Sequence, residues 1–296
     1  MRGRFAPSPT GPLHFGNLRT ALVAWLATRT VGGSFVVRME DIDPVVSSRE
    51  HGARQLTDLA RLGLDWDGGV VWQSDRRPLY DEVVERLIVR GLTYECFCTR
   101  REIQEAAQAP NAPIGPAGAY PGTCRALTLS ERAALRANGR SPALRLATDG
   151  LPVTIRDSLM GPFTATVDDF VLLRNDGVPA YNLVVVVDDH HQGITQVVRA
   201  DDLLSSAPRQ RYLMNVLGYR PPTYLHVPLV LGADGSRLAK RHGAVTLADL
   251  PSDFDALSLL AASLGLATPG ESVDLASLLE RFDIGRLPRD PWIFST

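Results

Sequence analysis

Apolar residues along the first ninety positions alternate between two spacings. The mostly apolar run at residues 34–39 predicts a buried strand, and residues 70–72 predict a short extended segment. Between and after them, apolar residues recur every three or four positions, which predicts helices over about residues 17–31, 48–62 and 79–90. Strands and helices that alternate in this way are typical of an α/β fold built on a parallel sheet.

The pattern changes in the middle of the chain and then returns. Short segments of alternating polarity predict a small antiparallel insertion, at residues 143–146, 153–157 and 161–166. Buried strands are predicted again at residues 170–174, 195–199 and 226–231. The residues after 247 have leucines at helical spacing, so we expect the chain to end in a short helical segment.

Composition narrows the class of protein. The chain has 296 residues, 45% hydrophobic and 22% charged, as in an ordinary globular protein with two or more modules. It has no run of about 18 apolar residues and no apolar leader, so we expect neither a membrane span nor a secretory signal. Three cysteines are too few for a disulfide framework and favour the reducing cytoplasm. The net charge of −2 excludes a uniformly basic surface but allows a local basic path for RNA.

The first residues of the chain are the strongest candidate for a binding site. A strand-like segment ends in a proline-rich turn at residues 8–11, and His14 and Gly16 then stand at the start of the helix that Asn17 begins. The first N–H groups of a helix have no partner within it and carry the positive end of its dipole, which favours phosphate. The pattern therefore predicts a nucleotide site.

Two further candidates follow predicted strands. Glu40 comes directly after strand 34–39, and Arg199 ends strand 195–199. Ligands of open parallel sheets bind at the carboxyl ends of strands, and an acid placed there suits an ammonium group or a ribose. The alternatives are a solvated loop acid at Glu40 and an ion pair between Arg199 and the acids at positions 201–202.

The distribution of lysine points to a second loop. Every basic residue of the chain is an arginine except Lys240, which lies in a segment that follows the predicted strand 226–231. An Asp-Gly-Ser turn there leads into a cluster of three cations, Arg237, Lys240 and Arg241. A retained lysine indicates a need for a compact, flexible ammonium, so we predict a mobile anion-binding loop. The alternative is that one lysine remained by chance.

The cysteines suggest a metal site. Cys96, Cys98 and Cys124 lie within 29 positions of one another, which suits coordination of a soft metal. Tyr120 or an acidic residue would supply a fourth ligand, and the alternative is three reduced, buried thiols. We expect the histidine pair 190–191 at a helix end or in a loop rather than on a metal, because neighbours on a helix face different directions.

Several of these segments together resemble the class I aminoacyl-tRNA synthetases. Residues 14–17 (His-Phe-Gly-Asn) are similar to the first signature of that family, and residues 237–241 (Arg-Leu-Ala-Lys-Arg) to its second, a Lys-Met-Ser-Lys-Ser-type loop. Residues 4–11, 38–43 and 198–203 resemble its glutamyl branch. The resemblance implies an α/β fold with a Rossmann-type catalytic domain on a parallel sheet, a zinc-bearing insertion and a short helical C-terminal extension.

On this basis we expect four parts in the chain. Residues 1–92 form the first half of the catalytic domain, and residues 166–243 form its second half with the phosphate loop. Residues 93–165 form the insertion with the zinc knuckle. Residues 244–296 form the C-terminal extension, without an anticodon-binding domain.

The resemblance also implies roles for individual residues. ATP, bound with Mg²⁺, is expected to contact His14, Gly16, Asn17 and Lys240, of which His14 and Lys240 are the expected catalytic residues. The expected glutamate pocket contains Arg4, Phe5, Ala6, Pro7, Ser8, Glu40, Tyr181 and Arg199. In the family a structural Zn²⁺ is bound by a pattern that matches Cys96, Cys98, Tyr120 and Cys124.

The length of the sequence favours one of the two functions known in the glutamyl branch. Full glutamyl-tRNA synthetases carry a helical anticodon-binding region that is missing here, so the chain resembles a shorter group that activates L-glutamate without tRNA. That group attaches glutamate to the queuosine base in the anticodon of tRNA(Asp), which implies ATP, L-glutamate and queuosine-bearing tRNA(Asp) as partners of a cytoplasmic monomer. The alternatives are a conventional core that charges the 3′ end of tRNA(Glu), a nucleotidylyltransferase, and an inactive relative that binds RNA.

Overall fold

The computed structural model describes residues 1–107, 119–236, 246–251 and 254–294. Its α-helices are α1 (Phe15–Arg29), α2 (Arg49–Arg61), α3 (Arg77–Val89), α4 (Arg100–Ala107), α5 (Leu129–Ala137), α6 (Tyr181–His191), α7 (Ala207–Leu217), α8 (Ala256–Ser263) and α9 (Leu275–Arg281). Its strands are β1 (Arg2–Phe5), β2 (Ser34–Met39), β3 (Val71–Trp72), β4 (Thr93–Cys96), β5 (Ala143–Leu146), β6 (Pro152–Asp157), β7 (Gly161–Thr166), β8 (Val171–Leu173), β9 (Gln196–Ala200), β10 (Thr223–Val227), β11 (Val230–Leu231) and β12 (Trp292–Ile293). Short 3-10 helices are η1 (Gln73–Arg76), η2 (Asp201–Ser206), η4 (Leu247–Asp249) and η5 (Ile284–Arg286).

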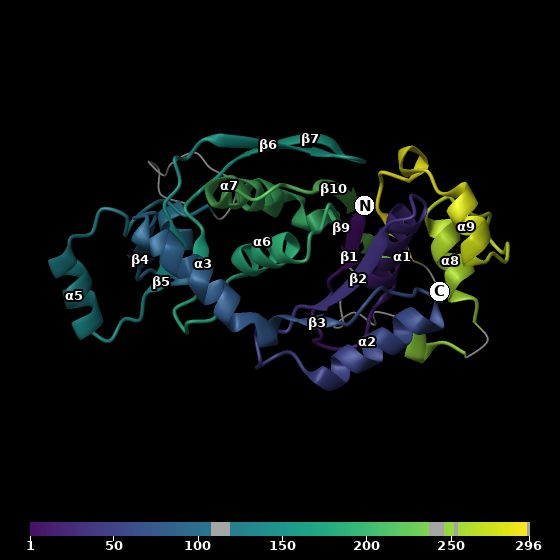
Figure 1. Ribbon diagram of the computed structural model, residues 1–296, viewed down its shortest axis with the longest axis horizontal. Coiled ribbons are helices and arrows are strands. Elements are labelled where there is room, and N and C mark those ends of the chain that lie inside the picture. The colour runs from purple at the N-terminus through teal and green to yellow at the C-terminus, as the bar shows by residue number, and fades with distance from the viewer. Residues whose placement is uncertain (108–118, 237–245, 252–253, 295–296) are drawn as a thin grey trace.

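A seven-stranded sheet forms the body of the molecule (Figure 1). Its strand order is β3-β2-β1-β9-β10-β6-β7, and its pairs are parallel except for the hairpin β6–β7. The connection through α1 places β2 on one side of β1, whereas β9 lies on the other side. The strand order therefore reverses between β1 and β9, and ligands of such sheets bind beyond the carboxyl ends of the strands at that point.

Many predicted elements are present with small shifts at their ends, and the α/β fold with a parallel sheet is confirmed. The strand predicted at residues 34–39 is β2, and the helix predicted from residue 48 is α2, which Ser48 caps by accepting the N–H of His51 at 3.1 Å. Helix α1 begins two residues earlier than predicted. It is buried on nearly all sides rather than along one stripe, because it packs between the main sheet and the helices α8 and α9.

The structure differs from the strand predictions in three places. The strand predicted at residues 226–231 is interrupted, because Pro228 has no N–H with which to continue a ladder, and β11 pairs instead with β12. The strand predicted at residues 170–174 is β8, which lies in a separate three-stranded sheet of order β4-β5-β8. The hairpin β6–β7, predicted as part of the insertion, extends the main sheet. The predicted division at residue 165 therefore does not coincide with sheet membership, and the domain divisions stay predictions.

The two ends of the molecule carry different parts of the chain (Figure 1). The small sheet and α5 lie at one end, and α8 and α9 lie at the other. The buried side chain of Arg19 in α1 connects α8 to the centre, because it donates to the carbonyl oxygen of Pro228 at 2.7 Å and to that of Ser263 at 3.2 Å. Burial lowers the pKa of Arg19 to about 10, which still leaves it charged at neutral pH. Within the described ranges, none of the helices combines the length and the apolar character that crossing a bilayer requires.

Candidate active site and metal site

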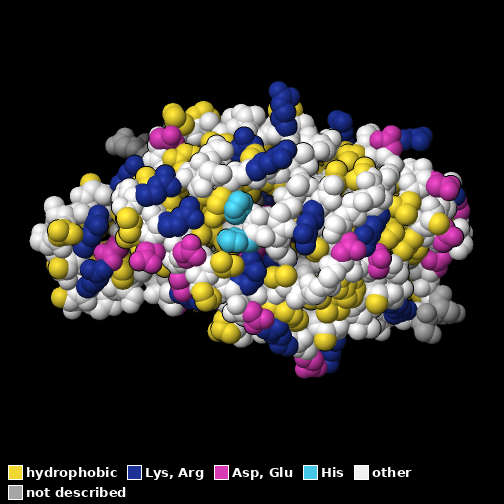
Figure 2. Space-filling model, viewed as in Figure 1, with side chains coloured by type: hydrophobic (Ala, Val, Ile, Leu, Met, Phe, Trp, Pro, Cys, Tyr) yellow, Lys and Arg dark blue, Asp and Glu magenta, His cyan; other side chains and the backbone are white. Residues whose placement is uncertain are grey.

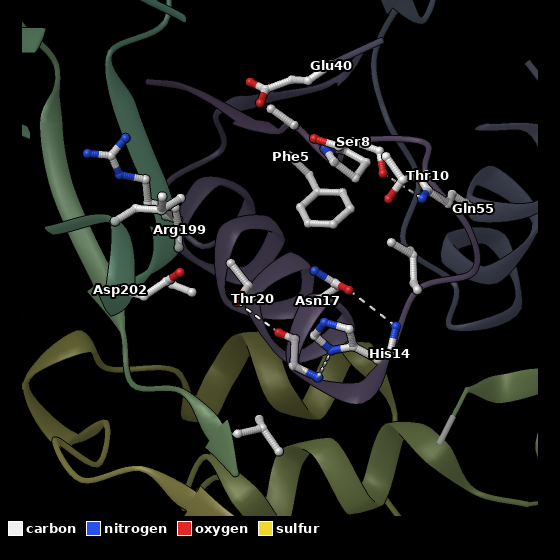
Figure 3. Close-up of a pocket in the computed structure, with 18 of the residues that line it drawn as sticks. Phe5, Ser8, Thr10, His14, Asn17, Thr20, Glu40, Gln55, Arg199 and Asp202 are labelled. Carbon is white, nitrogen blue, oxygen red and sulfur yellow. Dashed lines mark hydrogen bonds between the residues drawn. The ribbon is translucent and has the colours of Figure 1, made fainter. Parts of the chain in front are cut away.

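A cavity of about 620 Å³ opens at the carboxyl ends of β1 and β9 (Figure 3). Its lining includes every described residue that was predicted to bind ATP or glutamate, namely Arg4, Phe5, Ala6, Pro7, Ser8, His14, Gly16, Asn17, Glu40, Tyr181 and Arg199. The remaining predicted residue, Lys240, lies outside the described residues, as do its neighbours Arg237 and Arg241. Figure 3 shows Glu40 and Arg199 towards one side of the cavity and His14 with Asn17 towards the other. The roles of these residues stay predictions, but their positions form one site.

His14 shapes the start of α1. Its Nδ1 accepts the N–H of Gly16 at 3.1 Å, and its own N–H donates to Oδ1 of Asn17 at 3.2 Å. Because Nδ1 accepts, a neutral ring carries its proton on Nε2, which is then a donor. A Cβ atom at Gly16 would lie 3.0 Å from the imidazole, so glycine allows the ring to fold against the helix terminus. The structure thus presents a hydrogen-bond donor at the positive end of the α1 dipole, which favours phosphate.

The turn between β1 and α1 is held from α2. Nε2 of Gln55 donates to the carbonyl oxygen of Ser8 at 3.1 Å and to that of Gly11 at 2.7 Å. The N–H of Glu40 donates to the carbonyl oxygen of Pro7 at 2.9 Å. These bonds satisfy a proline-rich segment that cannot form a ladder of its own. Gln55 also lines the cavity, and it was not predicted as a site residue from the sequence. The signal that could have found it is a polar residue on the buried side of a predicted helix.

Buried ion pairs fix the position of Glu40. Nη2 of Arg38 lies 3.4 Å from Oε1 of Glu40, and Nη1 of Arg38 donates to Oδ1 of Asp189 at 2.8 Å. Burial opposes the charge on Arg38, but the carboxylates of Asp189, Glu40 and Asp188 raise its pKa above the ordinary value. Burial also raises the pKa of Glu40, against the effect of Arg38. Arg38 is therefore a permanent cation that orients the acid of the cavity.

Arg4 is placed by the same network. Its Nε lies 3.5 Å from Oδ1 of Asp189, and its Nη1 donates to the carbonyl oxygen of Val198 at 2.8 Å. Arg4 and Glu40 both line the cavity, with opposite charges. An amino acid carries both an ammonium and a carboxylate, so this pair of charges suits one.

Arg199 is held by three side chains. Its Nε donates to Nε2 of His226 at 2.9 Å, and its Nη1 donates to the hydroxyl of Tyr181 at 3.2 Å and to Oε1 of Gln210 at 2.9 Å. Its Nη2 is buried and has no hydrogen-bond partner among the described residues. A guanidinium that is held in place beside a cavity and has an unpaired N–H donor can bind a carboxylate. The sequence did not single out His226 or Gln210 as part of the site.

The three cysteines meet at the small sheet. Their Sγ atoms lie within 4.8 Å of one another, and in the part of the chain that is described they are the one such group of His, Cys, Asp or Glu ligand atoms. The hydroxyl of Tyr120 lies 3.3 Å from Sγ of Cys96 and 3.8 Å from that of Cys98, and it accepts the N–H of Cys124 at 2.8 Å. Three soft sulfurs and one oxygen that converge in this way fit a metal cation with four ligands.

The thiol of Cys98 would have to lose its proton on binding a cation. Burial raises the pKa of Cys98 to about 12, and the neighbouring Cys124 and Cys96 add to this effect. Without a cation this thiol keeps its proton, whereas a bound metal displaces it. The guanidinium of Arg145 lies 3.7 Å from the centre of the Tyr120 ring and so brings positive charge to the cluster.

The histidine pair lies at the C-terminal end of α6, where a helix-end position was predicted. The ring of His190 stacks on that of Tyr219, with centroids 3.6 Å apart. Burial lowers the pKa of His190, and His191 adds to the effect. His190 therefore packs on Tyr219, which follows α7, and neither histidine belongs to the cysteine cluster.

A second hollow, of about 1070 Å³, adjoins the first. The two share Ser8, Thr10, Glu40 and Tyr181. Its far side is lined by arginines of the small sheet and its neighbours, Arg100, Arg140, Arg145 and Arg174. Figure 2 shows basic and acidic side chains mixed over one face of the molecule, whose net charge is −2. Arg140 pairs with Glu102, and Arg174 pairs with Asp43 and Asp176, but arginines still outnumber acids in this lining. We call this hollow the basic hollow, and its excess of arginine suits a polyanion.

Comparison with known proteins gives consistent results. The family described as tRNA synthetases class I (E and Q), catalytic domain, matches residues 1–261. The chain is 56% identical to the glutamyl-Q tRNA(Asp) synthetase of Nocardia farcinica, over 99% of this chain and 93% of that protein. It is 40% identical to the glutamate–tRNA ligase of Geobacter sulfurreducens, over 100% of this chain and 64% of that protein. The crystal structure of a glutamate tRNA ligase from Elizabethkingia meningosepticum in complex with its amino acid matches with a TM-score of 0.81 and 25% identity, over 100% of this chain and 67% of that one.

Proposed function

The chain belongs to the class I tRNA synthetases of the E and Q group, and from that premise we propose that it activates L-glutamate with ATP and transfers it to the queuosine base in the anticodon of tRNA(Asp). The observation that carries the proposal is 56% identity, over 93% of its length, to a protein named glutamyl-Q tRNA(Asp) synthetase. The glutamate–tRNA ligase matches at 40% identity over 64% of its length, which favours this function over charging of tRNA(Glu).

Activation requires positive charge at the phosphate. The α-carboxylate of glutamate attacks the α-phosphorus of ATP, the bond from this phosphorus to the oxygen of the β-phosphate breaks, and glutamyl-adenylate and pyrophosphate result. Negative charge gathers on the phosphate oxygens in the transition state, so preorganised donors lower the barrier. We assign this role to Nε2 of His14, to the positive end of the α1 dipole and to Lys240. Mg²⁺ bound with ATP supplies further charge neutralisation.

The amino-acid end of the cavity accounts for a preference for glutamate. We assign the side-chain carboxylate to Arg199 and Arg4, and the α-ammonium to Glu40. The unpartnered Nη2 of Arg199 and the position of Glu40 beside Arg38 support these roles. A neutral amide in place of the side-chain carboxylate would lose the charge-assisted bonds to the arginines.

Transfer brings RNA to the adenylate. A ring hydroxyl of queuosine attacks the carbonyl carbon of the adenylate, an ester forms, and AMP leaves with release of one proton. The basic hollow borders Glu40 and Tyr181, so a base can approach the amino-acid end of the site while the RNA backbone lies against arginines.

We propose that Cys96, Cys98, Tyr120 and Cys124 bind one structural Zn²⁺. The donor set and the convergence of its atoms support this. A zinc ion with four protein ligands has no open position for chemistry, and it stabilises the fold. Here it would fasten β4 to the segment that contains Tyr120 and Cys124, on the edge of the basic hollow.

The test of the function has two stages. Glutamate-dependent exchange of pyrophosphate into ATP is measured without tRNA, and transfer of labelled glutamate is then measured to tRNA(Asp) with queuosine, to the same tRNA without queuosine and to tRNA(Glu). We expect exchange with glutamate alone and transfer to the queuosine-bearing tRNA(Asp) alone. Equal charging of tRNA(Glu) would favour a conventional core, and no exchange with any amino acid would favour the inactive RNA-binding protein.

A further inference from the structure

A line of hydrogen bonds runs beneath the cavity from Asp157 through His226 to Arg199. The three residues lie on the neighbouring strands β6, β10 and β9, and the parallel register places His226 directly beside Arg199. Oδ2 of Asp157 lies 2.6 Å from Nδ1 of His226, and Nε2 of His226 lies 2.9 Å from Nε of Arg199. All three side chains are buried, and Arg199 alone lines the cavity.

The partners of His226 determine where its proton lies. Nε of Arg199 is always a donor, so Nε2 of His226 must accept with its lone pair. Nδ1 then carries the proton and donates it to Asp157. The other oxygen of Asp157 accepts the N–H groups of Leu159 and Met160, at 2.9 and 2.8 Å. Burial acts to raise the pKa of Asp157, but the bonds from His226, Met160 and Leu159 lower it, so Asp157 is ionised and accepts.

The other charged groups around His226 also bear on its protonation. Burial lowers the pKa of His226 and outweighs the opposite effect of Asp157, and the positive charges of Arg199 and Arg4 add to the lowering. Tyr224 stacks on the imidazole with ring centroids 6.0 Å apart. The carboxyl of Asp201, at the start of η2, also interacts with His226. The ring therefore faces two arginines, two acids and a phenol, and it is neutral at pH 7.

We propose that Asp157 and His226 are positioning residues, which hold Arg199 in the orientation that receives a carboxylate of the amino acid, and that protonation of His226 at acid pH releases Arg199. The proposal rests on the proposed function, in which Arg199 binds glutamate. Under this proposal, residues of β6 and β10 contribute to the affinity for glutamate, although neither Asp157 nor His226 lines the cavity.

Protonation of His226 changes the number of hydrogen bonds that its ring can donate and accept. A protonated imidazole has two N–H groups and no lone pair, so it cannot accept from Nε of Arg199, and its charge repels the guanidinium. Arg199 then keeps its bonds to Tyr181 and Gln210 through Nη1 alone, and the guanidinium can turn about that contact. The KM for glutamate rises as a result, while the KM for ATP, which depends on the other side of the cavity, stays constant.

The test measures both KM values and kcat in pyrophosphate exchange with the full chain, from about pH 5.5 to about pH 8. His226→Leu removes both bonds, and we expect it to raise the KM for glutamate about tenfold to a hundredfold and that for ATP less than about twofold. His226→Gln keeps an oxygen acceptor for Arg199 without a titrating ring. We expect its KM for glutamate to stay within about threefold of the wild type at pH 7 and to lose the rise that the wild type shows below about pH 6.5.

Trp25→Phe is the matched control for the loss of a hydrogen bond to a carboxylate. It removes the 2.8 Å bond from the indole N–H to Asp65, outside the cavity, and should lower stability without changing the KM for glutamate.

If His226→Leu does not fold, the pH profiles of the wild type and His226→Gln decide the question. An identical rise of the KM for glutamate at acid pH in both proteins overturns the proposal. Absence of glutamate-dependent exchange in the wild type would refute the proposed function together with this inference. Normal wild-type exchange with unchanged KM values and pH profiles in both variants would refute the inference alone.

Discussion

Nη1 of Arg38 lies 2.8 Å from Oδ1 of Asp189, and the two side chains are only 0% and 2% exposed. Oδ1 of Asp189 also lies 3.5 Å from Nε of Arg4, and Arg38 in turn reaches Glu40. One carboxylate of α6 therefore supports Arg4, which we assign to the side-chain carboxylate of the amino acid, and through Arg38 it supports Glu40, which we assign to the ammonium.

Asp189→Asn should affect stability and substrate binding together. It leaves the buried guanidinium groups of Arg38 and Arg4 short of one negative charge, so we expect the free energy of unfolding to fall by about 3–5 kcal/mol. The KM for glutamate should rise in the same variant. Urea denaturation and pyrophosphate exchange measure the two effects. The control is Glu50→Gln, which breaks the exposed pair with Arg54 and should change neither quantity. A variant at position 189 with wild-type stability would show that the buried network does not hold the fold.

Two substitutions of His14 separate its structural role from its chemical role. Asn is a strong N-cap, so His14→Asn should keep the bond to the N–H of Gly16 and the stability of α1 but lose the donor at Nε2. We expect kcat for activation to fall about a hundredfold in this variant. His14→Ala should show the same loss of kcat and a further loss of about 1 kcal/mol in stability. Wild-type kcat in His14→Asn would remove His14 from the catalytic residues.

The metal proposal is tested by metal content. We expect about one zinc ion per chain in protein purified without chelators, and little or none in Cys124→Ser. Tyr120→Phe should release zinc to a chromogenic chelator faster than the wild type, because one ligand is lost. Tyr94→Phe is the matched control, since its hydroxyl donates to Asp169 at 2.7 Å in the same hydrophobic cluster and does not contact the cysteines. Equal release rates for the two tyrosine variants would exclude Tyr120 as a ligand.

Lys240→Arg tests the prediction drawn from the scarcity of lysine. A planar guanidinium does not replace a compact ammonium at a phosphate, so we expect the rate of pyrophosphate exchange to fall about tenfold or more, with an unchanged KM for glutamate. Arg54→Lys, the opposite exchange at an exposed position, should leave the rate unaltered. An unchanged rate in Lys240→Arg would show that the lone lysine has no special role.

Local chemistry made some elements predictable from the sequence. Strand β2 is a mostly apolar run between a glycine pair and an acidic segment, and α2 starts at a capping serine, so their ends follow from neighbouring residues. The alternating residues 153–157 likewise indicated a strand. They could not indicate its partner, because the contact of β6 with β10 depends on a register between residues far apart in the chain.

The lining of the cavity was predictable for a related reason. The carboxyl ends of parallel strands meet by topology, so Arg4, Glu40 and Arg199 converge once the strands are known. The residues that support them were not predictable. In the sequence, Asp189 indicates only the end of a helix and His226 only the start of a strand. Their roles depend on contacts with Arg38 and Arg199, which no local pattern in the sequence contains.

The hydrogen bonds of Arg19 link α8 to the cavity wall. None of the described residues of α8 lines the cavity, yet a fragment that stopped before α8 would lose Ser263 and leave the buried guanidinium with Pro228 as its acceptor. Because Pro228 lines the cavity, removal of α8 would also perturb the wall of the site. A helix that does not line the cavity thus supports one of its walls through a single buried cation.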